Sequence, residues 1–246
     1  MYEQKPFLYT LKFFLIALLT GVIILSVGFA FVKFVDKGES APPLPTSTEN
    51  DKTKIVIDPG HGGEDCGAVG IDGTLEKDLN LEIANLVCAL CILNGKDAIM
   101  TRTDDTLLYD YYDDLEDYTG QKKVYDLKNR LKIAEEYENA IYLGIHMNKF
   151  SQEKYSGTQI YYSKNNDLSG DIAKTLKDDI KANLQPNNTR EIKGANSSIY
   201  ILNNIENPAV LIECGFLSNQ DELENLKNEQ YRAKLALVIF SAICKY

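Results

Sequence analysis

A long apolar run lies near the start of the chain. Twenty consecutive residues without a charge, mostly Leu, Ile, Val, Phe and Ala, extend over 13–32, between Lys12 and Lys33. At about 1.5 Å per residue, a helix of this length matches a hydrocarbon core about 30 Å thick. The pattern predicts a transmembrane anchor over 13–35, after a short flank over 1–12. A cleaved signal peptide is the alternative, although its apolar region is usually shorter.

A polar stretch follows this run. Residues 36–53 contain Pro42, Pro43 and Pro45 together with Ser, Thr, Glu and Asp. Such a composition lacks the apolar side chains that a core needs. We therefore expect an extended linker over 36–53 and a folded domain over 54–246.

From residue 54 onward, short β-branched or alternating segments occur between longer segments with apolar residues every three or four positions. The short segments predict strands and the long ones predict amphipathic helices. Strands separated by helices favour an α/β fold, with a mostly parallel sheet and helices on both of its faces. The predicted strands are 54–57, 97–101, 140–145, 157–163, 199–202 and 209–213, and the predicted helices are 76–94, 122–138, 167–184, 221–226 and 230–245.

The five cysteines of the chain are too few and too uneven in number for a disulfide framework. Cys88 and Cys91 form a CxxC motif, but they lie within the apolar pattern of the first predicted helix, where small buried cysteines are common. No second CxxC accompanies them, so core positions are favoured over a metal or redox site. The apolar face expected for the same helix consists of Leu79, Ile83, Leu86, Leu90 and Leu93.

The net charge of −10 narrows the classes of partner. Residues 1–53 contain equal numbers of basic and acidic residues, so the excess lies on residues 54–246, with 21 basic and 31 acidic residues. An acidic domain argues against nucleic acid and against tight adhesion to anionic lipid. One segment, 103–120, holds seven acidic and no basic residues. A solvated loop is the favoured interpretation of it, and a partner contact or a lid over a cleft is the alternative.

The two histidines of the chain follow predicted strands. His61 comes after 54–57, and His146 comes directly after 140–145. In parallel sheets, ligands bind beyond the carboxyl ends of the strands, so these two side chains are candidates to share a metal ion. Zinc hydrolases commonly use three protein ligands, and His₂Glu is an established set.

The third ligand stays open on spacing alone. Glu76 begins the first predicted helix and so belongs to the same rim of the sheet. Glu64 and Asp65 lie in the preceding loop and compete with Glu76, whereas Glu82 should lie too far down the helix. A further carboxylate, Glu213, ends the apolar strand 209–213. Burial of such a group is costly unless it is paired, so it is either an ion-pair partner or an acid/base beside the metal.

Five motifs, taken together, closely resemble the zinc-dependent N-acetylmuramoyl-L-alanine amidases of the amidase 3 type. They occur in order and with the spacing of that family, from about residue 54 to the C-terminus. The motifs are IDPGHGGEDCGAVG at 57–70, EKDLNL at 76–81, TRTD at 101–104, IHMN at 145–148 and LIECGFLSN at 211–219.

The resemblance implies roles for particular residues. It implies that His61, Glu76 and His146 bind Zn²⁺ and that Glu213 is the catalytic acid/base, acting with zinc-activated water. It also implies a six-stranded, mostly parallel twisted sheet. The implied substrate is peptidoglycan, cleaved at the amide between N-acetylmuramic acid and L-alanine of the stem peptide.

The resemblance also suggests a cellular setting. A short, anchored amidase is similar to the sporulation amidases that act on spore-cortex peptidoglycan, with the catalytic domain held outside the membrane of a bacterial cell, or secreted if the apolar run is cleaved. An activating protein partner is a further expectation. The competing functions are a non-catalytic zinc-containing wall-binding or regulatory module and a zinc exopeptidase, which would need an arginine such as Arg102, Arg130 or Arg190 near the metal.

Overall fold

A computed structural model of the chain describes residues 53–246. Within them, none of the helices combines the length and the apolar character that crossing a bilayer requires. The flank predicted over 1–12, the anchor predicted over 13–35 and nearly all of the linker predicted over 36–53 lie outside the described residues.

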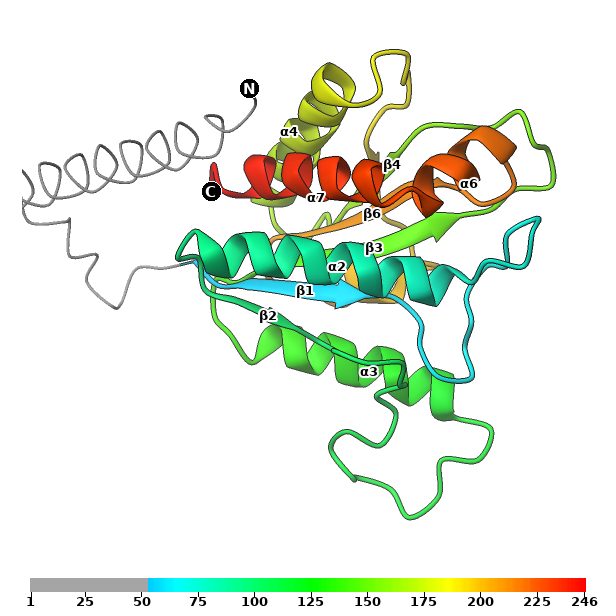
Figure 1. Ribbon diagram of the computed structural model, residues 1–246. Coiled ribbons are helices and arrows are strands. Elements are labelled where there is room, and N and C mark those ends of the chain that lie inside the picture. The colour runs from blue at the N-terminus through cyan, green and yellow to red at the C-terminus, as the bar shows by residue number, and fades with distance from the viewer. Residues whose placement is uncertain (1–52) are drawn as a thin grey trace, which may run out of the picture. The chain divides into compact units, whose positions relative to one another are not determined.

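The described residues form a six-stranded mixed sheet with helices on both faces (Figure 1). The strand order is β2-β1-β3-β6-β4-β5. β2, β1, β3 and β6 are parallel neighbours, whereas β4 runs antiparallel to β6. The strands are β1 (Ile55–Pro59), β2 (Ala98–Met100), β3 (Ile141–Asn148), β4 (Gln159–Tyr162), β5 (Lys193–Gly194) and β6 (Ala209–Phe216).

Two apolar layers hold the helices against the sheet. The helices are α2 (Glu76–Leu93), α3 (Lys122–Glu135), α4 (Leu168–Asn183), α5 (Tyr200–Asn204), α6 (Gln220–Lys227) and α7 (Glu229–Ile243). The larger layer packs α2, α4, α6 and α7 on one face, and the smaller packs α3 and α5 on the other. Figure 1 shows α2 and α7 on the side of the sheet opposite α3. The predicted α/β architecture is therefore confirmed.

The prediction of a strand over 199–202 is wrong, because residues Tyr200–Asn204 form helix α5. Its start is fixed locally, since the Asn196 side chain accepts a hydrogen bond from the backbone N–H of Ser198. Ile201, Leu202 and Ile205 then bury one side of the helix, a spacing of three or four residues that suits a helix better than a strand. The remaining strand of the sheet is the short β5.

The buried face of α2 differs in part from the predicted one. Leu79 and Ile83 are buried as expected, but Leu86 is 37% exposed and Leu93 is 82% exposed. The buried line instead continues through Val87 and Cys91, so the helix faces the core at intervals of four residues. Glu76 begins this line, which places a carboxylate at the end of a core-facing stripe.

The CxxC pair occupies core positions. Cys91 is fully buried and Cys88 is half-buried, and both contact the larger apolar layer. Burial raises the pKa of the Cys91 thiol to about 12, so the reactive thiolate is scarce at neutral pH.

The acidic segment 103–120 contains no helix or strand, but it has a small core of its own. The Tyr118 ring is buried and lies edge-on to the rings of Tyr109 and Tyr125, at centroid distances of 5.3 Å each. All seven acidic residues of the segment are exposed. The solvated-loop interpretation therefore holds for the charges, while the tyrosines give the segment a defined shape.

Candidate active site

Backbone shape at the carboxyl end of β1 sets the position of His61. A Cβ atom at Gly60 would lie 2.0 Å from the Cε1 atom of His146, so only glycine leaves room for that imidazole. Gly67 has a φ of +66°, and a Cβ there would lie 2.6 Å from the Oε2 atom of Glu76. His61 itself adopts a φ of 63°, a left-handed conformation that is uncommon for a residue other than glycine. The loop is shaped to bring three side chains together.

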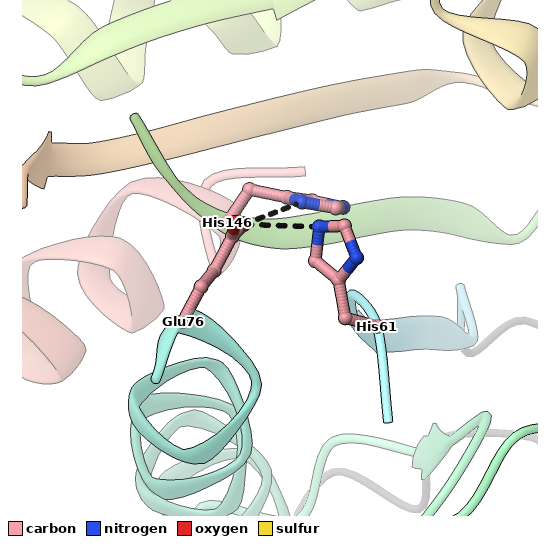
Figure 2. A group of neighbouring side chains, drawn as sticks. All are labelled: His61, Glu76 and His146. Carbon is pink, nitrogen blue, oxygen red and sulfur yellow. Dashed lines mark hydrogen bonds and ion pairs between the residues drawn. The ribbon is translucent and has the colours of Figure 1, made fainter. Parts of the chain in front are cut away.

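His61, Glu76 and His146 converge at the rim of the sheet. One ligand atom from each lies within 4.8 Å of the other two (Figure 2). The Oε1 atom of Glu76 lies 3.0 Å from Nδ1 of His146 and 3.3 Å from Nε2 of His61. The three residues come from α2, β3 and the loop after β1, so the arrangement depends on the complete fold.

The carboxylate of Glu76 is buried, and both of its oxygen atoms accept hydrogen bonds. Its Oε2 atom accepts a hydrogen bond of 2.7 Å from the backbone N–H of Ala68, and its Oε1 atom accepts one of 3.0 Å from that of Met147. Burial alone would raise the pKa of Glu76, but the hydrogen bonds and charges of His146 and His61 outweigh it and hold the pKa below its usual range. Glu76 therefore stays ionised and suits a cation.

Asp65 orients the imidazole of His61. Its Oδ2 atom lies 2.9 Å from Nδ1 of His61, and Lys123 contacts the same oxygen atom at 3.1 Å. A carboxylate beside one ring nitrogen keeps a proton there, so the other nitrogen, Nε2, can offer its lone pair to a metal ion. Without a metal ion, a proton on Nε2 would instead face Oε1 of Glu76, 3.3 Å away. Burial lowers the pKa of His61, but Glu76 and Asp65 together raise it above the usual value. A proton therefore competes with any metal ion for this ring.

Glu213 lies opposite His146 in the pairing of β6 with β3. Its Oε2 atom is buried and has no hydrogen-bond partner among the described residues. Burial, together with the negative charge of Glu76, raises the pKa of Glu213 to about 7 despite the opposing effect of the histidines. A buried polar atom without a partner is unusual, and a carboxyl group that titrates near neutrality is suited to proton transfer.

Two buried arginines hold the backbone of the loop that carries His61. Arg130 donates hydrogen bonds to the carbonyl oxygens of Pro59, at 2.9 Å, and of His61, at 2.7 Å. Arg102 donates to the carbonyl oxygens of Pro59, at 2.8 Å, and of Gly60, at 3.1 Å. Neither guanidinium is free to clamp a charged peptide terminus, so neither supplies the arginine that the exopeptidase alternative needs.

The charge of Arg130 is balanced within the core. Its guanidinium contacts Asp58 at 2.6 Å and Asp126 at 2.8 Å. Asp58 also accepts hydrogen bonds from the hydroxyls of Thr101 and Tyr142. Burial alone would raise the pKa of Asp58, but Arg130 and these hydroxyls hold it below its usual range. The sequence pattern does not predict this network, and its one local signal is the spacing of four residues between Asp126 and Arg130.

The other acids that competed with Glu76 lie elsewhere. Glu64 forms an exposed ion pair with Lys122 at 3.0 Å. Glu82 forms an ion pair with Arg232 at 2.7 Å, further along α2. Asp65 contacts His61 but is not part of the group of three convergent ligand atoms.

Comparison with known proteins places this site within a family. The model of the Amidase_3 family, described as N-acetylmuramoyl-L-alanine amidase, matches residues 55–245. The chain belongs to this family. It is therefore an N-acetylmuramoyl-L-alanine amidase, an enzyme that acts on peptidoglycan. The match covers the whole sheet, including every strand that supplies a residue of the site.

Individual members of the family are similar over the same region. The germination-specific N-acetylmuramoyl-L-alanine amidase of Bacillus subtilis (strain 168) is 38% identical over 192 residues, which cover 78% of each chain. The amidase LytC of the same strain is 29% identical, over 78% of this chain and 35% of its own length.

Solved structures show the same fold. The CwlD amidase from Clostridioides difficile, solved in complex with the GerS lipoprotein, is 40% identical, with a TM-score of 0.72 over 79% of this chain and 98% of that chain. The amidase AmiC2 of Nostoc punctiforme is 30% identical, with a TM-score of 0.65 over 80% of this chain and 97% of that chain.

Proposed function

We propose that His61, Glu76 and His146 hold a zinc ion and that the chain hydrolyses the bond between N-acetylmuramic acid and L-alanine with its help. The convergence of two imidazoles and one ionised carboxylate within 4.8 Å carries this proposal, because His₂Glu is a donor set typical of catalytic zinc. The absence of side chains at Gly60 and Gly67 leaves the space that this group needs.

A zinc ion held by His61, Glu76 and His146 would supply Lewis-acid chemistry, namely polarisation of the scissile carbonyl and a lower pKa for the attacking water. Glu213 accepts the proton of the attacking water at Oε2, the buried atom without a partner. It then returns this proton to the nitrogen of the departing L-alanine. In the metal-free protein, burial raises the pKa of Glu213 to about 7, which favours return of the proton to the leaving nitrogen. Asp65 keeps the His61 ring in its orientation throughout.

Metal removal tests the proposed zinc dependence. The purified full chain, dialysed against a chelator, should lose release of stem peptides from peptidoglycan, and one equivalent of Zn²⁺ per chain should restore it. Mass spectrometry of the products would identify peptides that begin with alanine. Full activity in protein that contains no measurable metal would contradict the proposal. If zinc-loaded protein is active only after a second protein is added, the partner proposed below is required.

We also propose a domain organisation that fits this activity. Residues 54–246 form the catalytic domain, 36–53 form a linker, and 13–35 anchor the chain in a membrane after the flank 1–12. The composition of 13–32, which is apolar and uncharged, supports the anchor. The substrate supports an extracytoplasmic location for the catalytic domain, because peptidoglycan lies outside the cytoplasmic membrane. Fractionation of cells and protease treatment of spheroplasts would test both points.

The relatives support a role in the spore. We infer that the chain trims cortex peptidoglycan, since the Bacillus subtilis relative that covers 78% of it is named germination-specific. The CwlD structure solved with a lipoprotein supports a protein partner for this chain as well. Spores of a strain without the gene should retain stem peptides on cortex muramic acid that wild-type spores lack. Unchanged cortex composition would exclude this role without affecting the amidase reaction itself.

A further inference from the structure

A β-bulge extends the active-site face of β6. His146 pairs with Glu213, and Asn148 pairs with Phe216, so β6 has one residue more than β3 between these two pairs. Side chains two residues apart on β3 point to the same face of the sheet. The extra residue therefore turns Phe216 to the face on which His146 and Glu213 lie.

Phe216 belongs to an aromatic shelf that we define as Phe150, Tyr155 and Phe216. The Tyr155 ring stacks on Phe216 with a centroid distance of 6.4 Å and meets the Phe150 ring edge-on at 4.8 Å. Phe216 is buried, whereas Phe150 is 50% exposed. The shelf thus begins beside the catalytic strand and ends in solvent, as a binding surface for an extended ligand would.

A guanidinium group lies over this shelf. The Cζ atom of Arg190 is 4.5 Å from the centroid of the Phe216 ring. Its Nε atom donates a hydrogen bond of 2.7 Å to the backbone carbonyl of Ser156, which fixes the plane of the group. Within residues 53–246, the two terminal nitrogens of Arg190 have no hydrogen-bond or ion-pair partner. The neighbouring carboxylate of Glu222 accepts hydrogen bonds from the backbone N–H groups of Gly157 and Phe216 instead.

Arg190 lies on the same rim as the acid/base. Gln159 is the register partner of Glu213 on β4, and its Nε2 atom donates a hydrogen bond of 2.6 Å to the carbonyl oxygen of Glu191, the next residue after Arg190. Burial and the charge of Glu213 raise the pKa of Tyr161, and the charge of Arg190 lowers it, so both charges act on one side chain.

We propose that Arg190 and the aromatic shelf bind the peptide half of the substrate, with the two free guanidinium nitrogens donating to a carboxylate of that peptide. The proposal rests on the amidase function described above. In the substrate, the carboxyl group of the muramic acid lactyl ether is consumed in the scissile amide. The remaining carboxylates therefore belong to the peptide. A planar, half-buried guanidinium with two N–H donor groups side by side suits a carboxylate better than it suits a sugar hydroxyl, because a carboxylate can accept from both groups at once.

Two matched substrates test the proposal. Both are soluble N-acetylmuramoyl-L-alanyl peptides of the same length, one with free carboxylates and one with every carboxylate converted to a carboxamide. The zinc-loaded full chain is compared with Arg190→Met, Arg190→Lys and the control Lys174→Met, which removes an exposed cation on α4 that pairs with Asp178. Thermal unfolding and zinc content verify that each variant is folded and loaded.

Arg190→Met should lower kcat/KM for the acidic peptide by about 10-fold to 100-fold, mainly by raising KM. A loss of this size is expected when one charge-assisted hydrogen-bond contact is removed. It should change kcat/KM for the carboxamide peptide by less than about threefold. Arg190→Lys keeps the positive charge but loses the two parallel donor groups of the guanidinium, so its kcat/KM for the acidic peptide should lie between those of the wild type and Arg190→Met. Equal losses on both peptides, or no loss on either, would overturn the proposal.

Binding without turnover separates this proposal from the proposed function. Titration calorimetry measures the affinity of the acidic peptide for Glu213→Gln and for Glu213→Gln combined with Arg190→Met. If the affinity of the double variant is lower by about 10-fold or more, the Arg190 contact is supported. If the zinc-loaded wild-type protein cleaves neither peptide, the zinc mechanism is contradicted, but the Arg190 contact is not. Equal affinities, or no binding to either variant, would count against Arg190.

Discussion

Glu213→Gln is expected to lower kcat by about 10²-fold to 10⁴-fold, the range typical of a lost general acid/base. Glutamine has nearly the same shape as glutamate but cannot carry the proton between water and the leaving nitrogen. Zinc binding should be retained, because Glu213 lies outside the convergent group of His61, Glu76 and His146. Release of stem peptides and zinc content, measured on the same preparation, check both points.

The matched control is Glu82→Gln, which neutralises an exposed acid on α2 that pairs with Arg232. It should leave kcat within about twofold of the wild type. A Glu213→Gln variant with full activity would show that another group moves the proton.

The same substitution has a consequence for the pH dependence of stability in metal-free protein. The pKa of Glu213 is raised from 4.5 to about 7 by burial, so between these pH values the folded state binds more protons than the unfolded state. The free energy of unfolding should therefore fall as pH rises from about 4.5 to about 7. Glu213→Gln removes this contribution, so the variant should exceed the wild type in stability above pH 7, by up to a few kcal/mol. Urea unfolding at several pH values measures the difference.

The second large effect is expected for Glu76→Gln, which should weaken zinc binding by more than about 100-fold. The ligand charge is lost, and both oxygens of Glu76 already accept backbone hydrogen bonds, from Ala68 and Met147. The amide nitrogen of glutamine would have to face one of these N–H groups, which should also cost about 1–3 kcal/mol of stability. Competition with a fluorescent chelator and thermal unfolding give the two values.

Neighbouring acids provide a graded comparison for Glu76. Asp65→Asn should weaken zinc binding by about 10-fold to 100-fold, as is typical when the partner of a ligating histidine is altered. Glu64→Gln should have no measurable effect, because Glu64 pairs only with an exposed lysine. If Glu64→Gln and Glu76→Gln weakened binding equally, the assignment of the third ligand would be wrong.

The regular elements were predictable where periodicity and burial agree. The five predicted helices lie within about three residues of α2, α3, α4, α6 and α7 at each end. The segment 199–202 was not predictable as a helix from its β-branched composition, since its conformation depends on the Asn196 turn and on the layer that covers Leu202. Short apolar segments carry too little periodicity to separate the two structures.

The site was predictable in part from position along the chain. His61 follows β1 and His146 lies near the end of β3, and these strands are parallel neighbours, which is enough to place both side chains on one rim. Spacing left Glu64, Asp65 and Glu76 as alternatives, and only the family motif favoured Glu76. The contacts of Arg102 and Arg130 with the loop after β1 span between 42 and 71 residues of sequence, and no local pattern encodes such partners.

The hydrogen bonds from the two buried arginines bear on whether the loop that carries His61 becomes ordered during folding or during metal binding. Three successive carbonyl oxygens, those of Pro59, Gly60 and His61, are already held by side chains of the protein. The entropy of ordering this loop is therefore lost when the chain folds and not when a cation arrives. In zinc fingers, by contrast, metal and fold appear together. We therefore expect the backbone of this loop to keep its conformation in metal-free protein.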